Sequence, residues 1–225
     1  MLQKQEKPKP VNGIITAIDT QSARTGRVSV FIDGSFFCGL NAATAARMRL
    51  KPGRPVDEAF CVVLLSAAEQ DSALNLALAS LSRASQPADR IRKKLVLRGF
   101  SEQTAASIIS RLREEGYLND DEYARKFVMD AIRLKKWGMI RIKKELSKKG
   151  IQPDSIQKAV DLQPETGTDE IVRVVLKKFG QQPDTVRVTR FLQYRGYSWE
   201  EINRIIRVVR KTSNDQQLPD GEDFP

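Results

Sequence analysis

Hydrophobic residues in the C-terminal two thirds of the chain recur with a helical period, and one twelve-residue pattern occurs there three times. Each copy opens with a basic and then an aliphatic residue, and it has a leucine five positions, a basic residue eight positions and a glycine nine positions after the start. The aliphatic residue and the leucine lie four positions apart and share one helical face, and such a glycine is typical of a left-handed helix end. We therefore predict three short helices that each bury one apolar stripe. The copies are RIRKKLVLRGFS (90–101), RIKKELSKKGIQ (141–152) and RVTRFLQYRGYS (187–198).

The distance between the copies indicates a repeat protein. They start at Arg90, Arg141 and Arg187, which are 51 and 46 residues apart. Self-similarity at such spacings is typical of stacked supersecondary units, because one unit alone cannot bury its apolar side. We predict a mainly α fold in which three tandem three-helix repeats form an elongated, curved array.

The residues before the repeats have a different pattern. Apolar and polar positions alternate over residues 13–40, and the pair Asp33-Gly34 lies between two alternating segments. This combination predicts a β-hairpin with a two-residue turn. One short helix is expected after Asn41 as its N-cap, and a second over residues 57–70. The result is a small α+β module, whose hairpin edge either packs on its own helices or serves as a docking strand.

Proline and capping residues divide the helical region further. Residues expected near helix starts or as caps are Pro87, Pro153 and Pro183, and Ser101, Asp154 and Ser198. The predicted parts are a disordered lead (1–12), the hairpin and helix module (13–70), three helical repeats (71–116, 117–164 and 165–211) and an acidic disordered tail (212–225).

Charge adds a second feature to the repeated helices. The net charge is +10 and the isoelectric point is near 9.7, whereas residues 212–225 contain acids and no base. A repeat protein that turns equivalent faces the same way presents one extended basic surface to a polyanion or an acidic protein. The alternative is a set of solvated faces placed near helix C-termini, where positive charge is favourable. The candidate contact residues are Arg90, Lys94, Arg98, Arg141, Lys144, Lys148, Arg187, Arg190 and Arg195.

The composition argues against most catalytic chemistry. The chain has no histidine, no GxxxxGK[ST] phosphate loop and no HExxH motif, so we expect neither a cofactor nor a zinc site. A magnesium-dependent nuclease built from converging carboxylates remains the enzymatic alternative. Cys38 and Cys61 are apolar-flanked and are expected to be buried free thiols, although a disulfide between them stays open. Without a secretory signal or an apolar run of membrane-spanning length, a cytoplasmic protein is expected.

The central repeat resembles a known family. The segment GYLNDDEYARKFV from Gly116 is close to the GYLDDxxYAxxF element of the RecX regulatory proteins, and a basic WG-x-x-RIKKEL-x-x-KGI segment follows it as in that family. The resemblance extends over residues 71–211, and the hairpin with the element at 50–53 resembles an N-terminal extension of some members. Asn119 departs from the aspartate that the family often has, but asparagine also caps helices.

Membership of that family would imply a non-enzymatic negative regulator of the RecA recombinase. Such a protein lies in the groove of the RecA filament on single-stranded DNA and inhibits ATP hydrolysis and strand exchange in recombination and DNA repair. The expected partners are the RecA filament and DNA, which is bound without sequence preference. Binding of single-stranded DNA is expected, and binding of double-stranded DNA is left open. No membrane partner is expected, and the protein is expected to be a monomer. The alternative is a general nucleic-acid-binding protein without a recombinase partner.

Two groups of residues keep two interpretations each. Trp137, Tyr194 and Trp199 are either core residues or exposed aromatics available to a partner. The acids at 120–122 either contact a basic recombinase surface or favour the N-terminus of the helix that Asn119 or Asp120 caps.

Overall fold

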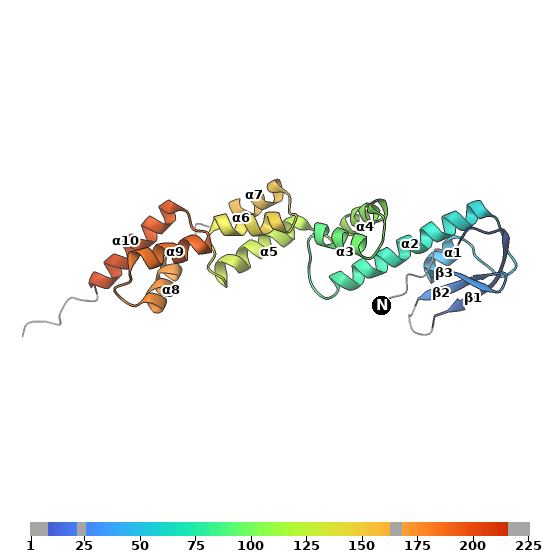
Figure 1. Ribbon diagram of the computed structural model, residues 1–225, viewed down its shortest axis with the longest axis horizontal. Helices are drawn as coiled ribbons and strands as arrows, with labels where there is room; N and C mark the ends of the chain where they lie inside the picture. Colours follow the sequence, from blue (N-terminus) through green and yellow to red (C-terminus); the bar gives the residue numbers. More distant parts are fainter. Residues whose placement is uncertain (1–8, 22–25, 163–167, 216–225) are drawn as a thin grey trace, which may run out of the picture. The chain divides into compact units, whose positions relative to one another are not determined.

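The computed structural model describes residues 9–21, 26–162 and 168–215, which form two compact units. The first unit comprises residues up to 86 together with 91–118, and the second comprises 87–90 and the residues from 119 onward. The fold is mainly helical with a small sheet-containing module at the N-terminal end, as predicted (Figure 1).

The N-terminal module contains an antiparallel sheet. Its strands are β1 (Gly13–Thr20), β2 (Arg27–Ile32), β3 (Ser35–Asn41) and β4 (Pro55–Val56), in the order β3-β2-β1-β4. The predicted two-residue turn joins β2 to β3, and its residues Asp33 and Gly34 have φ values of 47° and 80°. Positive φ at both central residues gives a turn whose twist matches the strands, which explains the Asp-Gly pair.

One face of the sheet packs on a helix and forms the first core. Ile15, Val30 and Leu40 from the strands are buried with Cys61 and Leu64 from that helix. Both cysteines are free and buried, as predicted. Burial, which disfavours the thiolate, and the nearby Cys61 raise the pKa of Cys38 to about 12.

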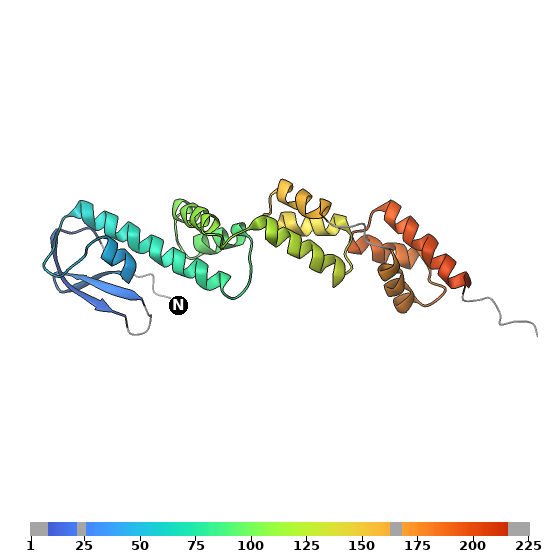
Figure 2. The ribbon, with the colours of Figure 1, turned by 180° about the vertical axis from the view of Figure 1, so that it is seen from behind.

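The helix on the sheet is longer than predicted. After α1 (Ala42–Arg47), a single helix α2 (Glu58–Leu81) crosses the position at residues 70 and 71 where two helices were expected to meet (Figure 2). That prediction is wrong because Asp71 neither caps nor interrupts a helix. Asp71 is buried, at 7% exposure, and its carboxylate accepts hydrogen bonds from Asn41 N (2.7 Å) and Thr44 Oγ1 (2.9 Å). The charge is held by the sheet module.

Two shorter helices follow α2. They are α3 (Ala88–Leu97) and α4 (Glu102–Glu114), and α4 packs on α2. Ser101 caps α4 as predicted, because its Oγ accepts a hydrogen bond from Thr104 N at 3.0 Å. The predicted apolar pair of the first basic helix, Ile91 and Leu95, is buried.

The second unit holds two further groups of three helices. The first is α5 (Asp120–Arg133), α6 (Met139–Lys148) and α7 (Pro153–Asp161), with Ile142 and Leu146 in its core. The second is α8 (Asp169–Phe179), α9 (Thr185–Arg195) and α10 (Trp199–Asp215), with Val188 and Leu192 in its core. In both groups the apolar stripe of the basic helix is buried, as the four-residue spacing predicts.

The helix ends agree with most of the predicted signals. The repeated glycines Gly99, Gly150 and Gly196 have φ values of 90°, 77° and 84°, the left-handed conformation expected of them. Asn119 caps α5 by accepting a hydrogen bond from Glu122 N at 2.9 Å. Ser198 begins a capping box, because Glu201 N donates to its Oγ and its own N–H donates to Glu201.

Three boundary predictions are wrong. Asp154 is no cap, because α7 begins one residue earlier at Pro153 and places the acid inside the first turn. The predicted tail begins too early, because α10 continues to Asp215, and residues 216–225 lie outside the described residues. The predicted disordered lead extends too far, because its last two residues bind α2. Asn12 Oδ1 accepts a hydrogen bond from Glu58 N (3.2 Å), and Val11 O accepts one from Cys61 Sγ (3.2 Å). Residues 1–8 of the lead lie outside the described residues.

The equivalent leucines provide a test of the repeat. Leu95, Leu146 and Leu192 are each at most 1% exposed, so replacing any one by alanine leaves a cavity and removes buried apolar surface. Each change is expected to lower the free energy of unfolding by about 2–5 kcal/mol. Denaturant unfolding measures this, and three widely different losses, or none, would show that the three positions are not equivalent.

Candidate interaction surface

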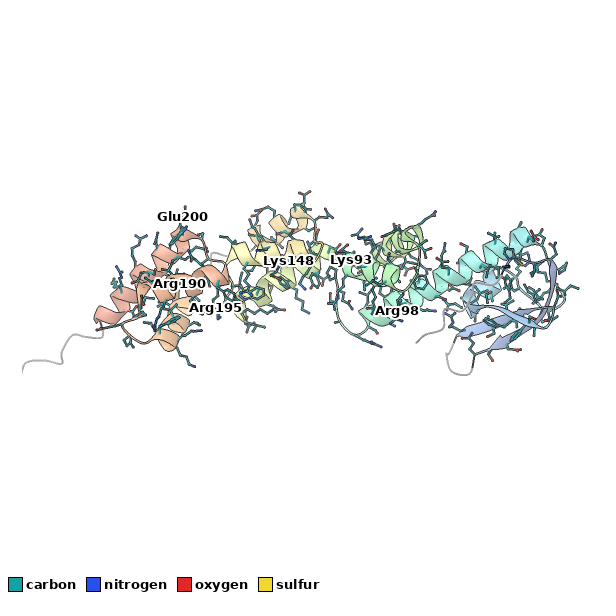
Figure 3. All side chains as sticks on the ribbon, viewed as in Figure 1. Lys93, Arg98, Lys148, Arg190, Arg195 and Glu200 are labelled. Atoms are coloured by element: carbon teal, nitrogen blue, oxygen red, sulfur yellow. The ribbon has the colours of Figure 1, made fainter. Side chains whose placement is uncertain are left out.

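The nine candidate basic residues differ in exposure. Six are exposed to solvent: Arg90, Arg98, Lys144, Lys148, Arg187 and Arg190. The remaining three, Lys94, Arg141 and Arg195, are partly buried and contact other parts of the protein. Figure 3 shows Arg98 just after α3, Lys148 on α6, and Arg190 and Arg195 on α9.

Some of the exposed charges already have an acidic neighbour. Lys148 Nζ lies 3.1 Å from Glu145 Oε1, and this hydrogen bond lowers the pKa of Glu145. Arg187 Nε lies 3.8 Å from Asp184 Oδ2. Within the described ranges, the other four exposed candidates form no ion pair. These four are Arg90, Arg98, Lys144 and Arg190.

Lys94 and Arg141 are held by neighbouring groups. Lys94 Nζ donates a hydrogen bond to Ser80 Oγ at 2.7 Å. The guanidinium of Arg141 lies 4.2 Å from the ring centroid of Trp137 and 4.8 Å from that of Tyr194, and it donates to Tyr194 O at 3.0 Å. This combination of two cation–π contacts and a hydrogen bond suits the flat, multiply donating group of arginine.

The reason for the position of Arg141 is a direct junction between two helix ends. Gly138 N donates to Arg195 O at 2.8 Å, and Ile140 N donates to Gly196 O at 3.1 Å. The first N–H groups of α6 therefore satisfy the last carbonyls of α9, groups that have no partner within their own helices. The partial charges of the two helix ends are opposite, so the contact is also electrostatically favourable.

Glycine is required on both sides of this junction. A Cβ at Gly138 would overlap the backbone of Gly196 and Tyr197, and a Cβ at Gly196 would overlap Arg141. Gly196 is one of the repeated glycines, but nothing in the repeat pattern identifies Gly138. Its only sequence signal is its place in the WG-x-x-RIKKEL segment.

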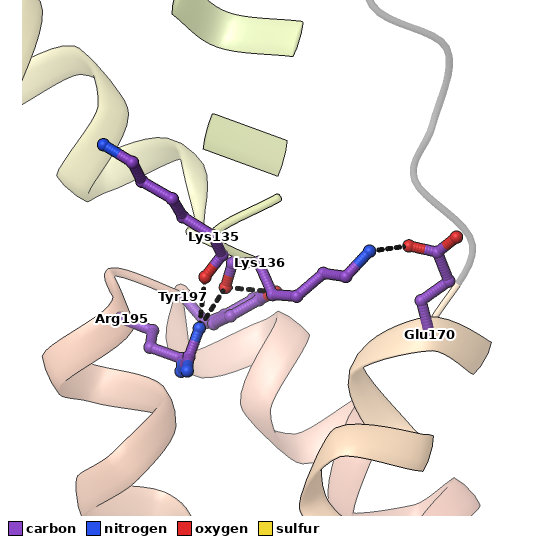
Figure 4. A network of polar contacts seen from close by, with 5 residues as sticks. All are labelled: Lys135, Lys136, Glu170, Arg195 and Tyr197. Atoms are coloured by element: carbon purple, nitrogen blue, oxygen red, sulfur yellow. Dashed lines mark hydrogen bonds and ion pairs between the residues drawn. The ribbon is translucent and has the colours of Figure 1, made fainter. Parts of the chain in front are cut away.

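A third helix end meets the same junction. Arg195 donates to the carbonyls of Lys135 and Lys136, which follow α5, and the Tyr197 hydroxyl donates to Lys136 O at 3.1 Å (Figure 4). The side chain of Lys136 pairs with Glu170 at the start of α8. The hydrogen bond and the charge of Lys136 lower the pKa of Glu170. The junction thus joins the two three-helix groups of the second unit through backbone groups.

The aromatic and acidic candidates divide between core and surface. Trp137 is partly buried, with its ring centroid 6.3 Å from that of Phe127, whereas Tyr194 is 76% and Trp199 is 62% exposed. Asp120 accepts a hydrogen bond from Ala88 N at 2.9 Å, which supports a structural role for it. The contact predicted for the acids at 121 and 122 stays a prediction.

The described part of the chain offers neither a metal-binding cluster nor a membrane-spanning helix. It contains no cluster of three or more cysteine, aspartate or glutamate side chains that could hold a metal ion. Nor does any of its helices have both the length and the apolar character needed to cross a bilayer.

We expect Gly138→Ala to disrupt the junction. Gly138 has φ near −79°, which alanine adopts easily, so the effect reports the overlap with the backbone of Gly196 and Tyr197. Forcing an extra methyl into a close contact costs about 1–3 kcal/mol. Denaturant unfolding followed by tryptophan fluorescence measures the loss. Gln152→Ala is the matched control, because Gln152 is an exposed N-cap without a side-chain hydrogen bond; an equal effect of both changes would contradict a role for close packing.

Tyr197 predicts a pH dependence. Burial, reinforced by Glu201 and Glu170 and opposed by Arg195, raises its pKa to about 12, from 10.0. The folded protein therefore keeps the proton over a range in which the unfolded chain loses it, so this contribution to stability is complete below pH 10 and falls as the pH rises toward 12. Unfolding at pH 9 and pH 11 measures the fall, which Tyr197→Phe is expected to reduce; an identical fall in that variant would exclude Tyr197 as its source.

Comparisons with known proteins agree with this architecture. A model of the RecX N-terminal domain matches residues 13–57, and one of the second three-helix RecX domain matches residues 119–160. A regulatory protein RecX of Clostridioides difficile is 28% identical over 201 residues, covering 86% of this chain and 94% of that protein. One of Clostridium acetobutylicum is 28% identical over 211 residues, covering 89% and 98%.

Solved structures show the same fold. A crystal structure of a regulatory protein RecX aligns with a TM-score of 0.69 at 24% identity, covering 87% of this chain and 99% of the other. The structure of RecX from Lactobacillus salivarius aligns with a TM-score of 0.55 at 22% identity, covering 63% and 96%. With a RecX sheet module, a RecX second helical domain and relatives matched over most of their length, the chain belongs to the RecX family of regulatory proteins.

Proposed function

We propose that this protein is a non-enzymatic negative regulator of the RecA recombinase. It binds in the groove of the RecA filament on single-stranded DNA, in the cytoplasm, and slows ATP hydrolysis and strand exchange. Family membership supports a regulatory role. The observation that carries the proposal is the set of exposed cations on the three repeated helices α3, α6 and α9, of which Arg90, Lys144 and Arg190 form no ion pair in the described chain.

The chemistry of these cations fits a polyanionic partner. An exposed, unpaired lysine or arginine gains little from its own protein, but it displaces condensed counterions when it meets a phosphate. Several such residues at intervals match a partner that repeats along its length, as a filament does. The binding energy is expected to be distributed and sensitive to salt, with each phosphate contact adding about one to the slope of log affinity against log salt.

The middle one of the three basic helices in the sequence is expected to matter most. Lys144 and Lys148 lie on the middle basic helix, and contacts in the middle of an extended interface are shielded from water by those around them. Lys144 is unpaired in the described structure, whereas Lys148 must exchange its partly exposed neighbour Glu145 for the partner. That exchange costs little, because an exposed ion pair contributes little to stability.

Lys144→Glu with Lys148→Glu is expected to raise the concentration needed to halve RecA's DNA-dependent ATPase on the order of tenfold, because contacts to an acidic partner become repulsive. Both side chains are exposed, so the thermal melt is expected to stay near that of the parent. The assay uses the full chain and RecA on single-stranded DNA at substoichiometric amounts of the regulator.

The matched control is Lys126→Glu with Lys158→Glu. These two exposed lysines lie on α5 and α7, outside the repeated helices, and the change in charge is the same. Equal weakening in control and test variants would show that net charge alone is sensed. Inhibition that appears only when the protein coats the DNA would favour the alternative of a general nucleic-acid-binding protein.

A further inference from the structure

An open groove lies between α9 and α10 in the last three-helix group. Its volume is about 730 Å³, and residues spaced along one face of each helix line it. Figure 3 shows Arg190, which lines this groove, on α9. It also shows Glu200 on α10, the residue that follows Trp199 in the sequence. The main lining side chains are Arg190, Gln193, Trp199, Asn203, Arg207 and Arg210.

Apart from Ile206, which also packs against the core, the groove side chains lie outside the core. The apolar stripes of the same helices, including Val188, Leu192 and Ile205, face the other way and are buried. Trp199 follows the cap Ser198 and remains 62% exposed. A tryptophan gains much from burial, so an indole left in water beside a groove is available for a ligand to cover.

The charge of the groove is positive. Its lining includes three arginines and no acid, and among the described residues none of these arginines forms an ion pair. Arg210 donates to Thr185 Oγ1 at 3.1 Å, and Arg207 Nε donates to Asn203 O at 3.3 Å, so two guanidinium groups are positioned by neutral acceptors. They keep their charge and further donors for a ligand.

The nearest acids are directed elsewhere or lie outside the groove lining. Asp184 caps α9 through Val186 N (2.8 Å) and neighbours Arg187, and Glu201 accepts from Ser198 N. Glu200, the residue after Trp199, is exposed and does not line the groove. The field along the groove is therefore set by the arginines.

We propose that this groove binds single-stranded nucleic acid, with one base stacked on Trp199 and the adjoining phosphates on Arg190 and Arg207. An exposed aromatic plane beside cations is the combination that binds unpaired bases without sequence preference. Gln193 and Asn203 add donors and acceptors for base edges or sugar. The assignment deepens the proposed function by naming the ligand of one part of the basic surface, but it concerns DNA binding by the chain alone.

The shape and chemistry of the groove favour this ligand over two others. In duplex DNA the bases are stacked on one another, so none is available to cover the Trp199 indole. An acidic peptide would satisfy the arginines, yet it has no flat aromatic group to cover that indole. Both are alternatives that the same measurement distinguishes.

The test uses the fluorescence of Trp199. The chain has two tryptophans, so Trp137→Phe leaves Trp199 as the only indole reporter. Adding a (dT)12 oligonucleotide at low salt is expected to quench its emission, whereas the matching duplex and a polyglutamate peptide are expected to leave it unchanged. Quenching by polyglutamate with equal affinity would overturn the proposal in favour of an acidic peptide, and no quenching despite (dT)12 binding would also overturn it.

Variants of the full chain test the partners of the base and the phosphates. Trp199→Ala is expected to weaken (dT)12 binding about tenfold, and Trp199→Phe much less, because a phenyl ring still stacks. Arg190→Gln with Arg207→Gln is expected to weaken it by a similar factor through lost phosphate contacts. Anisotropy of a labelled oligonucleotide measures both.

The control is Arg173→Gln with Lys177→Gln, which removes the same charge from exposed positions of α8 in the same helix group. Its affinity is expected to stay within about twofold of the parent, since neither residue lines the groove. A loss equal to that of the groove variant would show that only net charge matters and would overturn the proposal. RecA is absent from these binding measurements. A negative result for the groove therefore does not contradict the proposed inhibition of RecA, and a negative result in the ATPase assay does not contradict the groove.

Discussion

The second unit depends on one backbone junction. The N-terminal N–H groups of α6 donate to the C-terminal carbonyls of α9, and both helices approach closely because Gly138 and Gly196 lack a Cβ. Peptide groups that would otherwise need water or side-chain caps satisfy each other. Arg195 and Tyr197 then bind the carbonyls after α5, so three helix ends meet at one place. A contact made of backbone groups leaves little freedom of register between the two helix groups.

The contacts at the junction also distinguish two kinds of basic residue, those bound within the protein and those exposed to solvent. Arg141 and Arg195 are used inside the protein, where a planar guanidinium lies against aromatic rings while it donates to a carbonyl. A lysine ammonium has no such plane and cannot make both contacts in this way. Lys144, on the same helix as Arg141, is exposed, and no contact within the described structure fixes the position of its ammonium group. Such a charge suits phosphates whose positions vary.

The sequence predicted what local spacing determines. Ile142 and Leu146 are buried because residues four apart share a helical face, and Ser101 and Asn119 cap helices because their oxygens reach N–H groups three residues on. The Asp33-Gly34 turn follows for the same local reason. The candidate surface was predictable only as a list of basic residues, since helical spacing shows which side chains share a face but not what those side chains contact.

The sequence-based predictions fail where the contact that fixes a residue's role comes from a partner distant in the sequence. Asp71 resembles a helix start, but the carboxylate binds Asn41 and Thr44, thirty and twenty-seven positions away, and the helix continues through it. Arg141 has its partner fifty-three positions along the chain. A basic repeat therefore marks positions that carry charge, while tertiary contacts divide them between scaffold and surface. Positions whose guanidinium is occupied by carbonyls and rings stabilise the unit, and those left in water, such as Lys144 and Arg190, are free to neutralise a polyanion.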